Sequence, residues 1–150
     1  MKFKFSYQRL LEHYELQEQI ARRDFNDSVN TLDKQKEIQN KMYKEMDGAV
    51  DQIYEARTNP AGTSPSLLSH LDQFVDGQKV RLERQREVII NHTQIVEQKQ
   101  EILIAAAQQT KTLEKLKEKR RMEFKKLQKK MDAKATDELV VTRFRAGERR

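Results

Sequence analysis

All of the proline in this 150-residue chain lies in one short stretch, Thr58-Asn59-Pro60-Ala61-Gly62-Thr63-Ser64-Pro65. Proline has no backbone N–H and disfavours helical geometry in the residue before it, so two prolines this close end one helix and allow another to begin. Ser64 followed by Pro65 fits an N-cap and the first position of a helix. The stretch therefore predicts a turn over residues 58–65 that joins two long helices.

The composition favours a narrow helical seam over a thick globular core. Only 36% of the residues are hydrophobic, and 36% are charged. Most of the polar residues are good helix formers, which argues against disorder. The absence of cysteine excludes disulfides and thiolate metal sites and suits a reducing cytoplasm. We also expect no signal peptide and no membrane span, because no apolar run approaches the roughly 20 residues that a span needs.

A heptad pattern runs through the residues before the turn. Alternate steps of four and three from Tyr7 reach fifteen positions, of which eleven are apolar. These positions are Tyr7, Leu11, Tyr14, Glu18, Ala21, Phe25, Ser28, Leu32, Gln35, Gln39, Met42, Met46, Ala49, Ile53 and Ala56. Such a register predicts a coiled-coil helix over about residues 6–57, with Ser6 as its N-cap and a looser zone at the polar positions from Ser28 to Gln39.

The same stepping continues after the turn. It reaches Leu68, Leu71, Val75, Gln78, Leu82, Gln85, Ile89, His92, Val96, Lys99, Leu103, Ala106, Thr110, Leu113, Lys117, Arg120, Phe124, Leu127 and Met131. This pattern predicts a second, longer helix over about residues 65–141, followed by a frayed tail at 142–150. The predicted fold class is all-α: a single domain over residues 1–150, built as a long antiparallel two-helix coiled-coil hairpin.

Positive charge is concentrated in one segment of the second helix. Eleven Lys/Arg and four Asp/Glu lie between Lys111 and Lys134, whereas the other 126 residues sum to −1. If the hairpin turns near Gly62, residue x lies beside residue 123 − x, and Phe3 and Phe5 then lie near Leu116 to Arg120. The second helix is expected to overhang from there, and the overhang is basic. A charge-driven partner should therefore bind this end.

A second candidate surface lies nearer the turn. Tyr43, Val50 and Tyr54 follow the first seam by one position, and the same arithmetic puts them level with Phe74 and Val80. Two helices do not need so much apolar surface at one level. The surplus indicates either a locally widened seam or a lateral docking site for another protein.

No pattern in the sequence points to catalysis. It contains no Gly-rich phosphate loop, no Gly-x-Ser-x-Gly and no His-Glu-x-x-His. His13, His70 and His92 are far apart, and a two-helix rod offers no pocket that would desolvate a carboxylate. We therefore predict a protein that is not an enzyme and that has no catalytic residues, metal site or cofactor.

Three segments of the chain resemble signatures of the FliJ family of flagellar export proteins. The N-terminal signature of the family is similar to Phe3-Lys4-Phe5-Ser6-Tyr7-Gln8-Arg9-Leu10-Leu11. The C-terminal signature is similar to Leu113-Glu114-Lys115-Leu116-Lys117-Glu118-Lys119-Arg120-Arg121, followed by Asp137-Glu138-Leu139. Leu71-Asp72-Gln73-Phe74-Val75 resembles a central pattern less closely, because Leu71 and Gln78 stand where the family usually has Tyr and Leu.

The resemblance implies a cytoplasmic component of the bacterial flagellar type III export apparatus, positioned at the inner face of the cell membrane and similar to the central stalk of rotary ATPases. It implies three partners: the hexameric export ATPase, the transmembrane export gate protein and export chaperones. The candidate ATPase-binding residues are Phe3, Phe5, Tyr7, Lys115, Lys117, Lys119, Arg120, Arg121, Phe124, Lys125, Lys126 and Leu127. The candidate gate-binding residues are Tyr43, Val50, Tyr54, Phe74 and Gln78.

Three other functions fit the sequence less well. The basic helix could bind nucleic acid, but acidic residues are interspersed along it and Phe124 is its only aromatic. A membrane-surface helix is disfavoured because basic residues surround the segment. A generic coiled-coil adaptor or spacer has no use for an unpaired basic end. We expect a monomer in isolation that binds no nucleic acid and does not insert into the membrane.

Overall fold

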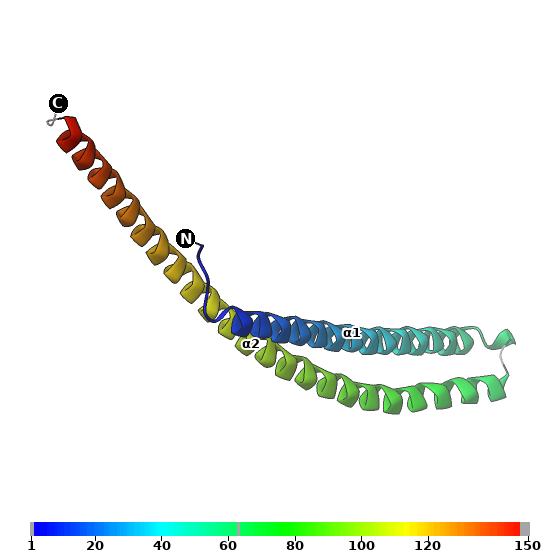
Figure 1. Cartoon of the computed structure of the whole chain (residues 1–150). Coiled ribbons are helices and arrows are strands. Elements are labelled where there is room, and N and C mark those ends of the chain that lie inside the picture. The colour runs from blue at the N-terminus through cyan, green and yellow to red at the C-terminus, as the bar shows by residue number, and fades with distance from the viewer. Residues whose placement is uncertain (1, 63, 148–150) are drawn as a thin grey trace. The chain divides into compact units, whose positions relative to one another are not determined.

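The structure of the protein is a computed structural model that describes residues 2–62 and 64–147. Helix α1 covers Gln8–Thr58, the short 3-10 helix η1 covers Pro60–Gly62, and helix α2 covers Pro65–Gly147 (Figure 1). The described residues contain no strand. The predicted all-α hairpin, with its longer second helix of 83 residues against 51, is confirmed.

The helix ends differ slightly from the predicted ones. α1 begins at Gln8, two residues after the expected start, and α2 continues six residues beyond the expected Val141. Residues 142–147, expected to fray, are therefore helical, and residues 148–150 of the expected tail lie outside the described residues. Thr63 of the expected turn also lies outside them.

Contacts within the chain divide it into two compact units. The terminal unit combines residues 1–19 with residues 105–150, and the turn unit consists of residues 20–104. Both helices contribute to each unit.

The start of α2 has the local geometry that its sequence predicts. The Ser64 hydroxyl accepts a hydrogen bond from the Leu67 backbone N–H at 3.1 Å, and Pro65 is the first helical residue. An N-cap hydroxyl satisfies one of the backbone donors left open at a helix start, and proline at the first position has no donor to satisfy. The predicted roles of Ser64 and Pro65 are confirmed.

The core of the turn unit is the narrow seam between α1 and α2. Its buried apolar residues are Ala21, Leu32, Ala49, Val75 and Leu82, all at predicted heptad positions. Two glutamines on α2 share this seam and bridge to α1. Gln85 Nε2 donates to the backbone oxygen of Gln35 at 3.0 Å and to its Oε1 at 2.8 Å.

These bridges fix the register of the two helices. Gln85 meets Gln35, and Gln78 Nε2 donates to the backbone oxygen of Met42 at 3.1 Å, so residue x of α1 lies beside residue 120 − x of α2. The expected relation was 123 − x. The difference of three residues is almost one helical turn, because the midpoint of the observed pairing is Pro60 rather than a point beside Gly62.

The terminal unit continues the seam with Leu11 on α1 and Thr110 on α2, both buried. Residues 2–5 are not helical, and Phe5 is buried there. The Gln8 N–H donates to the Phe5 backbone oxygen at 3.2 Å, which leads the chain into α1. Beyond Phe124, every described residue of α2 is exposed.

Candidate functional site

Residues 2–7 form a strap that lies across α2 in the terminal unit. Phe5 is buried, and its ring meets that of Tyr7 edge-on with centroids 5.9 Å apart. The ring of Phe3 packs against Phe124 of α2 with centroids 5.7 Å apart. Such tilted aromatic pairs are favourable beyond the apolar area that they bury. The N-terminal aromatic residues of the predicted ATPase surface thus contact one another, and Phe3 contacts its α2 portion.

Arg120 of α2 binds this strap through a hydrogen bond and a cation–π contact. Its Nη1 donates to the Ser6 hydroxyl at 2.9 Å, and its guanidinium carbon lies 5.1 Å from the centre of the Tyr7 ring. A guanidinium at this distance is attracted by the negative face of the ring. Ser6, expected to cap α1, thus accepts a hydrogen bond from α2. Arg120, expected to be available to a partner, is half-buried under the strap.

The strap reaches farther along α2 than the sequence arithmetic indicated. Phe3 and Phe5 were expected level with Leu116 to Arg120, but Phe3 packs on Phe124. The reason is the extended backbone of residues 2–5, which advances about 3.3 Å per residue where a helix advances about 1.5 Å. The uncovered basic helix therefore begins after Phe124.

The basic side chains of the terminal unit differ in exposure. Lys117 is half-buried like Arg120, whereas Lys115, Lys119, Arg121, Lys125 and Lys126 are exposed. Lys117 and Arg121 line an open hollow of about 280 Å³ with Leu11 and three carboxylates, Glu15, Glu114 and Glu118. Acidic residues thus offset the positive charge where α1 and α2 pair.

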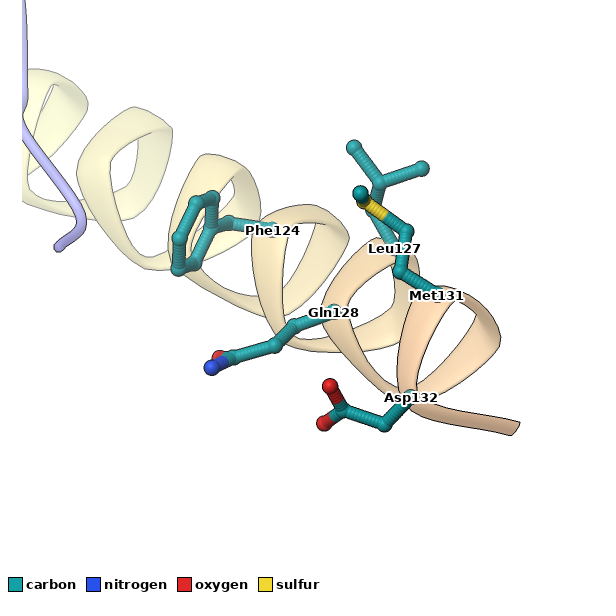
Figure 2. A pocket seen from close by; sticks show the side chains of 5 residues that line it. All are labelled: Phe124, Leu127, Gln128, Met131 and Asp132. Atoms are coloured by element: carbon teal, nitrogen blue, oxygen red, sulfur yellow. The ribbon is translucent and has the colours of Figure 1, made fainter. Parts of the chain in front are cut away.

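An apolar stripe starts under the strap at Phe124 and continues on the uncovered part of α2. Phe124, Leu127 and Met131 follow one another at helical spacing and, with Gln128 and Asp132, line an open hollow of about 200 Å³ (Figure 2). These apolar residues continue the heptad seam past the point where α1 and the strap end. An apolar seam without a partner helix is a candidate contact surface for another molecule.

The candidate gate-binding residues of the turn unit differ in exposure. Tyr43, Val50 and Tyr54 on α1 are exposed, Tyr54 at 71%. Gln78 is only 3% exposed, and its amide is 3.5 Å from Glu45 Oε2 as well as hydrogen-bonded to Met42. Gln78 therefore belongs to the seam and cannot lie on a docking surface. The three exposed α1 residues do not widen the seam.

Phe74 lies on the other flank of the hairpin from Tyr43 and Val50. One row along α1 contains Tyr43, Val50 and Arg57, which are spaced by seven residues. The Arg57 guanidinium lies 3.5 Å from the Asp72 carboxylate, so the row of α2 that contains Asp72 faces this row of α1. Phe74 precedes seam residue Val75 and belongs to the opposite row, where the Arg81 guanidinium lies 5.6 Å from its ring centre. The five candidate residues do not share one surface.

Two further features of the surface were not predicted from the sequence. The turn end holds an open hollow of about 450 Å³ lined by Gln52, Glu55, Ala56, Asn59, Ala61, Gly62, Leu67 and Leu71. At the far end of α2, Leu139, Val140, Val141 and Phe144 are all strongly exposed. The sequence contains a signal for the second feature, because three consecutive apolar residues, Leu139 to Val141, stand among charged residues near the end of the chain.

No group of three or more His, Asp or Glu side chains among the described residues is arranged to hold a metal ion. No described helix has a window apolar enough to cross a membrane.

Comparison with known proteins points to one family. The family model described as "Flagellar FliJ protein" matches residues 3–149, nearly the whole chain. Searches of curated proteins and of solved structures found no match. The match covers the strap, both helices and the turn between them. The chain therefore belongs to the FliJ family, a family of non-enzymatic flagellar proteins involved in flagellar export.

Proposed function

We propose that this protein is a stalk and coupling component of the flagellar type III export apparatus. Its terminal unit docks in the ring of the export ATPase, and its turn unit contacts the transmembrane export gate. Export chaperones are further partners, and the protein works at the inner face of the cell membrane. The observation that carries the proposal is the uncovered basic end of α2, which has no partner among the described residues.

The charge and width of this end support docking in a ring. Eleven of the chain's Lys and Arg residues lie between Lys111 and Lys134, and Lys125, Lys126, Lys129, Lys130 and Lys134 lie on the uncovered helix. A single helix with its side chains is about 10–12 Å wide, which suits a narrow channel better than a flat surface. Carboxylates or backbone carbonyls along the channel would relieve the repulsion between the lysines and speed association.

The proposed gate contact uses the exposed α1 residues Tyr43, Val50 and Tyr54. Tyrosine side chains suit a partner surface because they bury a large area and keep a polar end. Phe74 would serve this contact only if the gate reaches around both flanks. Gln78 contributes indirectly, since its bond to Met42 holds α1 in register directly before Tyr43.

ATP hydrolysis by the purified export ATPase tests the ATPase contact. The test variant reverses Arg121, Lys125 and Lys126 to Glu, which leaves Arg120 and the strap intact. The matched control reverses Lys34, Lys36 and Lys41, three exposed lysines of the turn unit. We expect the wild-type protein and the control to stimulate hydrolysis and the test variant to lose the stimulation. Equal stimulation by both variants would show that the basic end has no part in this contact.

A further inference from the structure

The far end of α2 carries an apolar collar, formed by Leu139, Val140, Val141 and Phe144. Their exposed fractions are 63%, 57%, 50% and 73%, and Phe144 is among the most exposed large apolar side chains of the chain. An exposed apolar run of this kind is unfavourable in water, and contiguous exposed apolar patches mark interaction sites. Val140 and Phe144, with Arg143 and Gly147, line an open hollow of about 430 Å³ that could accept a partner's side chain.

The four collar residues do not share one face of the helix. Successive residues of an α-helix are rotated by about 100°, so Leu139, Val140 and Val141 point in three widely separated directions. Phe144 lies between the directions of Val140 and Val141. The apolar stripe at Phe124, Leu127 and Met131 behaves differently, because its spacing of three and four keeps it on one side.

We propose that the collar is enclosed from more than one side by a single ring-shaped partner whose lumen is apolar at this level. The inference rests on the proposed docking in the ATPase ring and specifies the chemistry of the wall. The wall would be acidic beside Lys125–Lys134 and apolar beside the collar. Arg143 and Arg145, within and just beyond the collar, add a further requirement for acceptor groups there.

Other occupants of the collar fit the observations less well. A lipid surface touches one side of a helix lying on it, and would leave either Leu139 or Val141 in water. A second copy of the chain that packs in parallel would bring its own basic segment, with a net charge of +7 between Lys111 and Lys134, close to the same segment of the first copy. Like charges at such distances repel unless other groups intervene. A ring wall can cover both Leu139 and Val141, and acidic groups beside Lys125–Lys134 would attract the basic segment rather than repel it.

Site-specific photo-crosslinking tests the enclosure directly. A benzoylphenylalanine is placed in the full-length protein at Leu139, Val140 or Val141, one position per variant, and each variant is irradiated with the ATP-bound export ATPase hexamer. A fourth variant carries it at Lys129 and reports docking of the basic segment alone. A fifth carries it at Tyr54, which is as exposed as the collar and lies in the turn unit.

We expect crosslinks to the ATPase from Lys129 and from all three collar positions, and none from Tyr54. Crosslinks from Lys129 with one collar position or none would overturn the enclosing collar while leaving the proposed docking intact. Absence of crosslinks from Lys129 as well would overturn both. Capture of the three collar positions by a second copy or by anionic vesicles (phosphatidylcholine with phosphatidylglycerol), with no ATPase capture, would also overturn the collar proposal.

Affinity supplies a second readout. Val140→Ser with Phe144→Ser should weaken binding of the full-length protein to the ATPase by about tenfold or more, since two large apolar side chains lose their burial. Tyr54→Ser is the control and should leave this affinity unchanged. Because both collar residues are exposed in the free protein, its helix content should persist, which circular dichroism checks. Unchanged affinity of the double variant would contradict the proposal.

Discussion

Single residues in the seam decide register as well as stability. Gln85 is buried at a heptad position where leucine would bury more apolar surface, yet its amide makes two bonds to Gln35 across the seam. A polar residue at one seam position can specify alignment at some cost in stability. Gln78 makes the equivalent bridge to Met42 two turns closer to the loop. Within the polar zone that the sequence suggested would be loose, Gln35 is therefore hydrogen-bonded across the seam.

Substitution of Gln85 separates these two contributions. Gln85→Ala removes the bonds and leaves space in the seam, so the free energy of unfolding should fall by about 1–2 kcal/mol. Gln85→Leu should cost less or increase stability, because it restores apolar contact without an unsatisfied amide. Thermal unfolding followed by circular dichroism measures both. A leucine variant less stable than the alanine variant would contradict this role of the seam.

Arg120 is expected to hold the strap. Arg120→Ala removes a hydrogen bond to Ser6 and a contact with Tyr7, together worth about 1–2 kcal/mol at a partly exposed site. Hydrogen exchange at the backbone amides of residues 8–11 should accelerate by about 5- to 30-fold. Arg81→Ala, which removes the similar contact with Phe74 in the turn unit, serves as control. Equal protection in wild type and Arg120→Ala would show that the aromatic packing alone holds the strap.

At the scale of the elements, the start of α2 is stabilised by one side chain. Ser64→Ala removes the acceptor for the Leu67 N–H and should lower the free energy of unfolding by about 1 kcal/mol. Ser69→Ala is the matched control: Ser69 is exposed inside the same helix, where alanine is the better helix former. Its stability should be unchanged or slightly higher. Denaturant unfolding of the two variants compares them, and equal losses would refute the cap.

The seam was predictable from the sequence because burial in a two-helix pair follows the heptad directly. Leu11, Leu32 and Leu82 are buried at the positions where the pattern placed them. The position at which a residue of α1 pairs with α2 was predictable to within one helical turn. The flank was assigned wrongly, because counting residues from a turn gives only the height along the hairpin, whereas the flank depends on whether a residue precedes or follows a seam position. That is why Phe74 and Tyr43 were assigned to one surface although they belong to opposite rows.

The contacts of the strap could not be predicted from the heptad pattern, for a different reason. A non-helical segment has no fixed rise or face, so the sequence could not show that Phe3 packs on Phe124 or that Ser6 binds Arg120. The collar was missed because it breaks the heptad: Leu139, Val140 and Val141 obey no helical period. Both features lie where the chain departs from the regular coiled coil.

At the scale of the whole molecule, charge is the property that distinguishes one region. The 24 residues from Lys111 to Lys134 carry a net charge of +7, and the other 126 residues carry −1. Exposed charges act over about 8 Å at physiological ionic strength, so this segment dominates the field that an approaching partner meets. Association with a negatively charged channel should therefore be fast at low salt and slower as salt rises.

The association rate constant with the export ATPase hexamer, measured by stopped flow at two salt concentrations, tests the account most directly. The wild-type rate should fall by about tenfold or more between low and high salt. The variant with Arg121, Lys125 and Lys126 reversed to Glu should bind slowly at both, and the Lys34, Lys36 and Lys41 control should behave as wild type. A wild-type rate that is independent of salt and unchanged by the reversal would contradict docking through the basic end of α2.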